Sequence, residues 1–157
     1  MKKIVLKSAL ITVGALIVAG ILIFSLWLLI SPQTMASSSE KLGNYKFAVT
    51  CANLKYKYSG ETEDLARCAE DSILSKKDKL IVKYCEKLLE CDDFEEYCNE
   101  RDKQLSSHVG QYLSQPNYKA YIIGTLSLSQ YREGDLEKAI KTAESGGNLD
   151  CFRKLII

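Results

Sequence analysis

Residues 8–30 read SALITVGALIVAGILIFSLWLLI and contain no charged side chain. In a helix that rises about 1.5 Å per residue, this run is about 34 Å long, which exceeds the roughly 30 Å hydrocarbon core of a bilayer. A helix also pairs its backbone polar groups internally, as lipid requires. The run therefore predicts an N-terminal transmembrane helix, and it makes the lipid bilayer the first expected partner.

Two other interpretations of this run stay open. A cleaved signal sequence has an apolar region of about 7–15 residues, which is shorter than this one, but Thr34 and Ala36 in the segment TMASSS form a weak cleavage site. A buried helix of a soluble domain is the other alternative.

The flanks of the run predict its orientation. Lys2, Lys3 and Lys7 precede it, whereas the next basic residue is Lys41. The positive-inside bias places the N-terminus in the cytoplasm and the rest of the chain outside, and Trp27 near the far end is typical of a membrane interface. Residues 1–30 are thus expected to form a cytoplasmic stub and a signal anchor in the cell membrane.

The remainder of the chain divides into a linker and one domain. Residues 31–39 read SPQTMASSS, which predicts a linker over 31–40 ahead of a domain over 41–157. Three of the 21 basic residues and none of the 20 acidic residues precede Ser31, so the net charge of residues 31–157 is about −2. With no basic tract, nucleic acid is not an expected partner.

Apolar residues in this domain recur three and four positions apart and never alternate, which is typical of helices. The pattern predicts helices at 42–58, 62–74, 78–90, 94 up to Pro116, 117–132 and 135–145, with a short one at 149–157. Loops of a few residues make consecutive helices antiparallel neighbours. The expected fold class is therefore all-α: a transmembrane helix followed by three α-α hairpins and a cap.

Residues 131–143 read YREGDLEKAIKTA, the clearest local motif. Gly134 tolerates a turn, Asp135 suits a helix N-cap, and Ala139 permits close helix packing. The motif, within residues 120–146, resembles the centre of a tetratricopeptide repeat. Fainter copies surround Gly60 and residues 91–93, at spacings of about 32 and 42 residues. Three generic hairpins with one chance match remain the alternative.

This resemblance implies a concave face, lined by the first helix of each hairpin, that binds a protein or peptide. The alternative is that these side chains belong to the core. The residues implied are Phe47, Leu54, Tyr58, Val82, Glu86, Leu89, Tyr121, Leu128 and Tyr131.

All six cysteines lie beyond the apolar run, and in an exported domain this number suggests disulfides. Residues at equal height in an antiparallel hairpin lie equally far from the centre of its turn. Cys51 and Cys68 are symmetric about Ser59 and Gly60, and Cys85 and Cys98 are symmetric about residues 91 and 92. Two bridges are therefore expected, with Cys91 and Cys151 left free or joined to each other. Six small buried thiols in a reducing compartment are the alternative.

The sequence offers little for chemistry. A catalytic triad would have to use His108, the one histidine, and there is no C-x-x-C pair or glycine-rich phosphate loop. No catalytic residue, metal or cofactor is therefore expected. The predicted function is a non-enzymatic, membrane-anchored, extracytoplasmic scaffold that binds a protein or peptide. An accessory subunit or small enzyme of the cell envelope, and a spacer that oligomerises through its anchor, are the alternatives.

Overall fold

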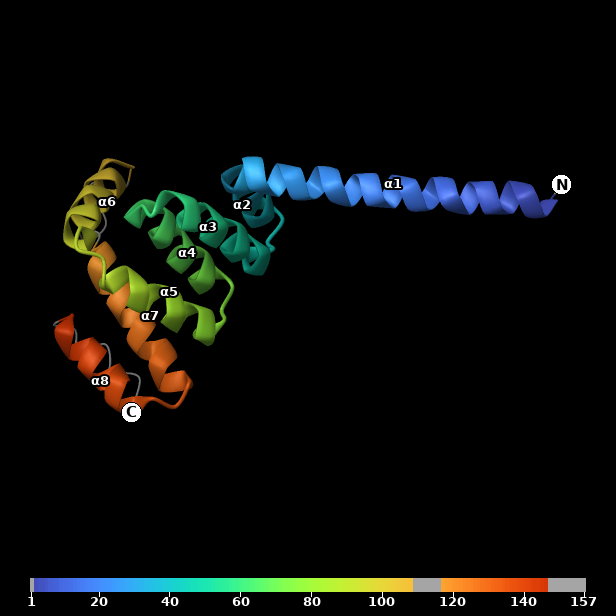
Figure 1. Ribbon diagram of the computed structural model, residues 1–157. Coiled ribbons are helices and arrows are strands. Elements are labelled where there is room, and N and C mark those ends of the chain that lie inside the picture. Colours follow the sequence, from blue (N-terminus) through green and yellow to red (C-terminus); the bar gives the residue numbers. More distant parts are fainter. Residues whose placement is uncertain (1, 109–116, 147–157) are drawn as a thin grey trace.

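The computed structural model describes residues 2–108 and 117–146, and within these ranges the chain forms eight helices and no strand (Figure 1). The predicted all-α class is confirmed. The predicted helix at 149–157 and the end of the one that begins at Phe94 lie outside the described residues. The helices are α1 (Lys2–Ile30), α2 (Pro32–Lys41), α3 (Tyr45–Ser59), α4 (Thr62–Leu74), α5 (Asp78–Leu89), α6 (Phe94–His108), α7 (Tyr118–Arg132) and α8 (Leu136–Ser145).

Helix α1 projects from the other helices as a single long rod (Figure 1). Its stretch Ile11–Ile30 is long and apolar enough to cross a membrane, and no residue in it is buried. The rod touches the domain only near its C-terminal end, where the Phe24 ring stacks on Phe47 of α3 with 6.3 Å between ring centroids. No other described part of the chain covers most of the apolar surface of this stretch.

Residues 32–41, where a linker was expected, form helix α2, which reverses direction after α1 and packs on α3. Pro32 begins the helix, at a position where proline needs no hydrogen-bond donor. The hydroxyls of Ser38 and Ser39 donate to the carbonyls of Thr34 and Met35, at 2.9 and 2.7 Å. Ser38 and Ser39 are thus accommodated within the helix, because each of these two hydroxyls bonds one turn back.

The helix boundaries follow from caps that the sequence supplies. The side chains of Asn44, Asn117 and Asp135 each accept a hydrogen bond from a backbone N–H three residues on, at the starts of α3, α7 and α8. Gly60 and Gly134 adopt positive φ angles of 72° and 91° in the turns after α3 and α7. The turns predicted around these two glycines are confirmed.

The main core lies between α3, α4, α5, α6 and α7. Its largest fully buried side chains include Leu65, Leu88, Ile122 and Leu126. A second, smaller cluster joins Met35 and Ala36 of α2 to Cys51 of α3, with Leu28 of α1 and Phe47 packed against it. This smaller cluster ties the end of the rod to the domain.

The pairing of the helices departs from the prediction at one hairpin. Helix α3 packs on α4 and α7 packs on α8, as expected, but α5 packs mainly on α4 and α7. Helix α6 lies instead against α7 and, more lightly, α4. The predicted hairpin of 78–90 with 94–115 is therefore opened, and α2, α4 and α6 are left to line a common surface.

Candidate binding groove

Two adjoining hollows, of about 310 and 260 Å³, run along the surface formed by α2, α4 and α6. They share Glu63, Tyr97 and Arg101, and they therefore form one continuous feature, which we call the α2/α4/α6 groove. Helix α4 provides the floor, while Gln33 and Glu40 of α2 and residues of α6 provide the sides. Pairing of α6 with α7 rather than α5 places α6 where it can border the groove.

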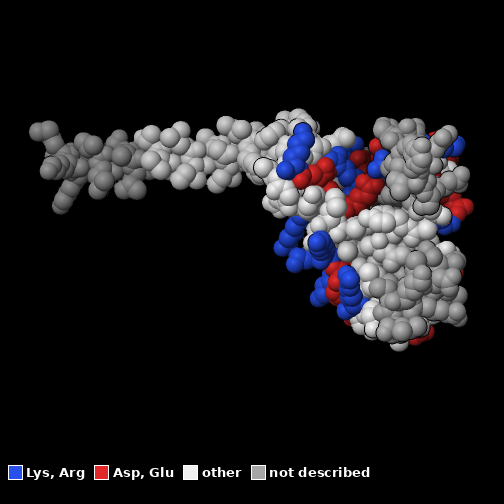
Figure 2. All heavy atoms as spheres, turned by 180° about the vertical axis from the view of Figure 1, so that it is seen from behind, with Lys and Arg blue, Asp and Glu red and all other residues white. Residues whose placement is uncertain are grey.

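The groove is strongly acidic. Figure 2 shows red and blue side chains gathered between the α2 end and the rest of the domain, whereas residues 11–30 of α1 carry no charged side chain. Among the described residues, the two basic side chains that line it are Arg67 and Arg101. The nine acidic side chains that line it are Glu40, Glu61, Glu63, Asp64, Glu70, Asp71, Asp93, Glu96 and Glu100.

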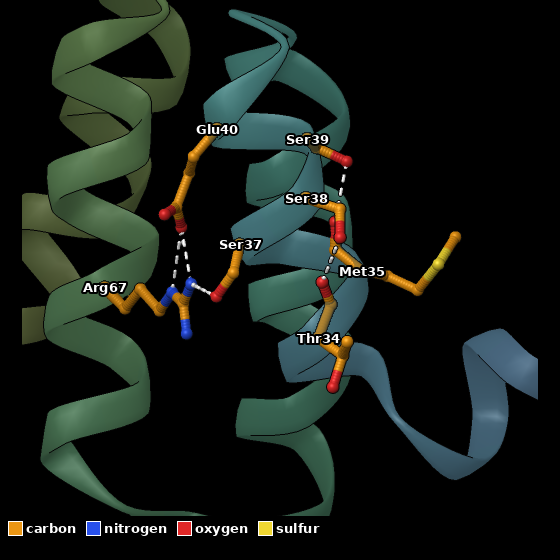
Figure 3. Close-up of polar contacts among 7 residues, drawn as sticks. All are labelled: Thr34, Met35, Ser37, Ser38, Ser39, Glu40 and Arg67. Atoms are coloured by element: carbon orange, nitrogen blue, oxygen red, sulfur yellow. Dashed lines mark hydrogen bonds and ion pairs between the residues drawn. The ribbon is translucent and has the colours of Figure 1, made fainter.

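Arg67 on α4 fastens α2 to the groove floor (Figure 3). Its Nη2 lies 2.6 Å from Oε1 of Glu40 and 2.8 Å from Oγ of Ser37, and its Nε donates to the same Glu40 oxygen at 3.0 Å. A planar guanidinium suits such a fork of acceptors better than an ammonium group does. The positive charge of Arg67 is thereby committed to α2.

Arg101 on α6 plays a similar part on the other side. Its Nη2 lies 3.3 Å from Oε1 of Glu70, which joins α6 to α4. Its Nε is buried and has no hydrogen-bond partner. The groove therefore contains one donor that no described residue pairs with.

Asp71 is the most unusual group in the groove. Its side chain is only 2% exposed, and its Oδ2 atom has no hydrogen-bond partner. Burial, followed by the nearby Glu40 carboxylate, raises the pKa of Asp71 to about 7; Arg67 opposes this rise and Glu70 adds to it. A carboxylate in this environment binds a proton or a cation readily, because burial penalises its unpaired charge.

The nine side chains predicted to line a peptide-binding face do not line this groove. Phe47 packs against α1 and α2, while Val82 and Leu89 pack against the main core. Glu86 accepts a hydrogen bond from Gln130 at 2.9 Å. Leu54 and Leu128 are half-buried, and exposed aromatic surface remains at Tyr58, Tyr121 and Tyr131.

The predicted disulfides are not formed: the five described cysteines are free thiols, and Cys151 lies outside the described residues. Cys51 belongs to the small cluster with α2, whereas Cys68 belongs to the main core, so the two side chains pack in different clusters. Cys85 and Cys98 share the main core, but α5 and α6 do not pack as a hairpin. Equal height along two helices was thus insufficient to pair them.

No group of three or more potential metal ligands occurs among the described residues. His108 is the last residue of α6, and its side chain lies outside the described part. Comparison of the chain with models of protein families, with curated proteins and with solved structures finds no match. The evidence for function therefore comes from the chain itself.

Sequence reasoning missed the groove because it gave the acids of residues 61–71 no role in binding. One signal was present. Asp71 lies three residues after Cys68 and seven residues after Asp64. Helical periodicity therefore places Asp71 beside the apolar stripe that contains Leu65 and Cys68. An acid on that side of a helix is exceptional, because buried carboxylates are rare without a partner.

Proposed function

We propose that this protein is a membrane-anchored, extracytoplasmic helical scaffold that binds a protein or peptide partner in the α2/α4/α6 groove. The observation that carries the proposal is the groove itself: three helices border a continuous hollow, and buried polar atoms of Asp71 and Arg101 there lack partners. Unsatisfied buried polar groups are costly and are normally paired in a finished assembly.

The anchor has two supports. The stretch Ile11–Ile30 has the length and composition of a membrane span, and the basic residues that flank it precede it. A cut after Ala36 would remove Met35 and Ala36, which are buried against α3, together with Leu28. Retention of α1 is therefore consistent with the packing of the domain.

Kinship with tetratricopeptide repeats is the finer part of the proposal. Its support is the α7–α8 hairpin, where Gly134 has a positive φ, Asp135 caps α8, and Ala139 and Ala143 are buried. Stacked hairpins of this kind provide extended binding surfaces. In this chain the surface proposed for binding lies on α2, α4 and α6, rather than on the face formed by α3, α5 and α7.

Site-specific photo-crosslinking in intact membranes tests this function. A benzoylphenylalanine would replace Gln33 on α2 or Glu96 on α6, since both side chains are exposed in the groove. We expect both positions to give the same discrete adduct, because they border one continuous site. Glu137 on α8, an exposed acid outside the groove, is the matched control and should give none.

The same experiment covers the face predicted from sequence. Crosslinkers at Tyr58 and Tyr121 report on that face, because both side chains are at least half exposed. Adducts at these two positions and none at Gln33 or Glu96 would place the binding site on the face predicted from sequence. That result would refute binding in the groove. The absence of adducts at every position would contradict the binding function as a whole.

A further inference from the structure

We infer that the α2/α4/α6 groove takes a basic segment of its partner and that a lysine or arginine side chain of that segment pairs with Asp71. This inference rests on the proposed function of the groove and adds the chemistry of its ligand. Three observations carry it: a buried carboxylate oxygen without a partner, an excess of acids around it, and an unused donor beside it.

The first observation is the state of the Asp71 side chain. It is only 2% exposed, and it borders the hollow between α2, α4 and α6. No group among the described residues donates to Oδ2. Because an unpaired buried acceptor destabilises a folded chain, a group supplied by a ligand is the natural partner for this atom.

The second observation is the balance of charge. Both arginines of the groove are already engaged, Arg67 with Glu40 and Arg101 with Glu70. By contrast, Glu63, Glu96 and Glu100 form no ion pair with a described residue, and they line the same hollow. The charge left for a ligand is therefore negative, which attracts basic segments and repels acidic ones.

The third observation distinguishes a peptide from a bare cation. The Nε of Arg101 is a buried donor without a partner. A basic peptide carries both complements, an ammonium or guanidinium group for Asp71 and a backbone carbonyl for Arg101. A metal ion would leave Arg101 unsatisfied, and no group of three or more potential metal ligands is present in the described residues.

Binding of a cation at Asp71 is coupled to pH. Burial and the neighbouring carboxylates raise the pKa of Asp71 to about 7, so near neutrality about half of the free protein holds a proton there. A positive side chain in the groove lowers that pKa, and binding therefore releases the proton. The charged and titratable groups that face Asp71 come from α2 (Glu40), α3 (Cys51), α4 (Arg67, Cys68, Glu70) and α6 (Arg101).

The test uses the full-length protein in nanodiscs of zwitterionic lipid, which does not itself attract cationic peptides. The probe is a short fluorescent peptide of alternating lysine and serine with blocked ends, and its partner probe has glutamate in place of lysine. We expect fluorescence anisotropy to show binding of the lysine peptide alone. Asp71→Asn should weaken that binding about ten-fold or more, because it removes a charge-assisted hydrogen bond.

Two comparisons separate a specific contact from general attraction. Glu137→Gln makes the same change of charge on α8, outside the groove, and should leave the affinity unchanged. From pH 6 to pH 8 the wild-type affinity should rise about ten-fold as Asp71 ionises, whereas the Asp71→Asn affinity should stay flat.

Several results would overturn the inference. Equal binding by Asp71→Asn and Glu137→Gln would show that Asp71 is not the contact. A calcium-dependent rise in the melting temperature of the wild type that Asp71→Asn abolishes would assign the position to a metal instead. If the lysine peptide fails to bind while crosslinking at Gln33 and Glu96 still gives the adduct, the groove keeps its proposed function and the basic partner is wrong.

Discussion

Asp71 destabilises the folded chain, and the same side chain is the contact that we propose for a ligand. Its carboxyl pKa is raised from 3.8 to about 7, first by burial and then by Glu40. Between these two values the unfolded chain loses the proton and the folded chain keeps it. Ionisation therefore favours the unfolded state, and stability falls as the pH rises through this window.

Replacement of Asp71 with asparagine should remove this effect. We expect Asp71→Asn to be more stable than the wild type by about 1–3 kcal/mol at pH 8, since the substitution removes a buried, unpaired charge. At pH 3, where the carboxyl is largely neutral in both the folded and the unfolded state, the two proteins should differ little. Thermal unfolding followed by circular dichroism at both pH values measures the difference, and a less stable variant at pH 8 would mean that the carboxylate has a partner within the chain.

The cysteines provide a second prediction at this scale. Burial raises the pKa of the Cys68 and Cys85 thiols to about 12, so the reactive thiolate is scarce at neutral pH. Cys91, by contrast, is only partly buried. Among the five described cysteines, Cys91 should therefore be alkylated first by iodoacetamide, as followed by mass spectrometry over time. A peptide that joins Cys51 to Cys68 after non-reducing digestion would contradict the structure.

Among the elements, α7 and α8 show how a local motif specifies a hairpin. The φ of Gly134 is 91°, a conformation that L side chains rarely adopt, and the Asp135 side chain accepts from the N–H of Lys138. Both roles were predicted from residues 131–143 alone. They could be predicted because a turn and a cap depend on a few consecutive residues.

Substitution of glycines in and beside α7 should have opposite effects. Gly134→Ala forces an L side chain into the left-handed region and should destabilise the protein by about 1–2 kcal/mol. Gly124→Ala, inside α7, meets no atom within 4 Å of the new Cβ and should stabilise it by about 0.5–1 kcal/mol. Denaturant unfolding at equilibrium measures both, and equal effects of the two changes would refute the role given to Gly134.

Local signals predicted most helices well, but they could not predict which helices pack together. The expected ranges 62–74 and 135–145 agree with α4 and α8 to within one residue, because charged first turns and glycines mark their ends. Helix α2 was missed because its serines bond within the helix, which composition does not reveal. The partners of α5 and the position of α6, and hence the groove, depend on contacts between distant residues.

For the whole molecule, the exposed apolar rod is the dominant feature. Residues 11–30 contact the domain only through Phe24 and Leu28 near their C-terminal end, so water would meet most of their apolar surface. We expect the full-length protein to stay in the membrane pellet after alkaline carbonate extraction. The substitutions Val18→Lys and Leu22→Lys, at about 2.5–3.5 kcal/mol each near the bilayer centre, should release it.

A lysine outside the span provides the control for this experiment. Leu42 is 85% exposed at the end of α2, and Leu42→Lys should leave the protein in the pellet. Release of the unchanged protein by carbonate would contradict the anchor. Release from the pellet of the double variant with Val18→Lys and Leu22→Lys, and of no other protein, would support insertion through residues 11–30.

The connection between α1 and α2 is short. Only Ser31 separates the rod from α2, and the stacked Phe24 and Phe47 rings join the rod to α3. If α1 spans a membrane as proposed, this short connection holds the domain, with its acidic groove, close to the lipid surface. Proteins resident in the same bilayer would therefore meet it at a high effective concentration, whereas freely diffusing ones would gain no such advantage.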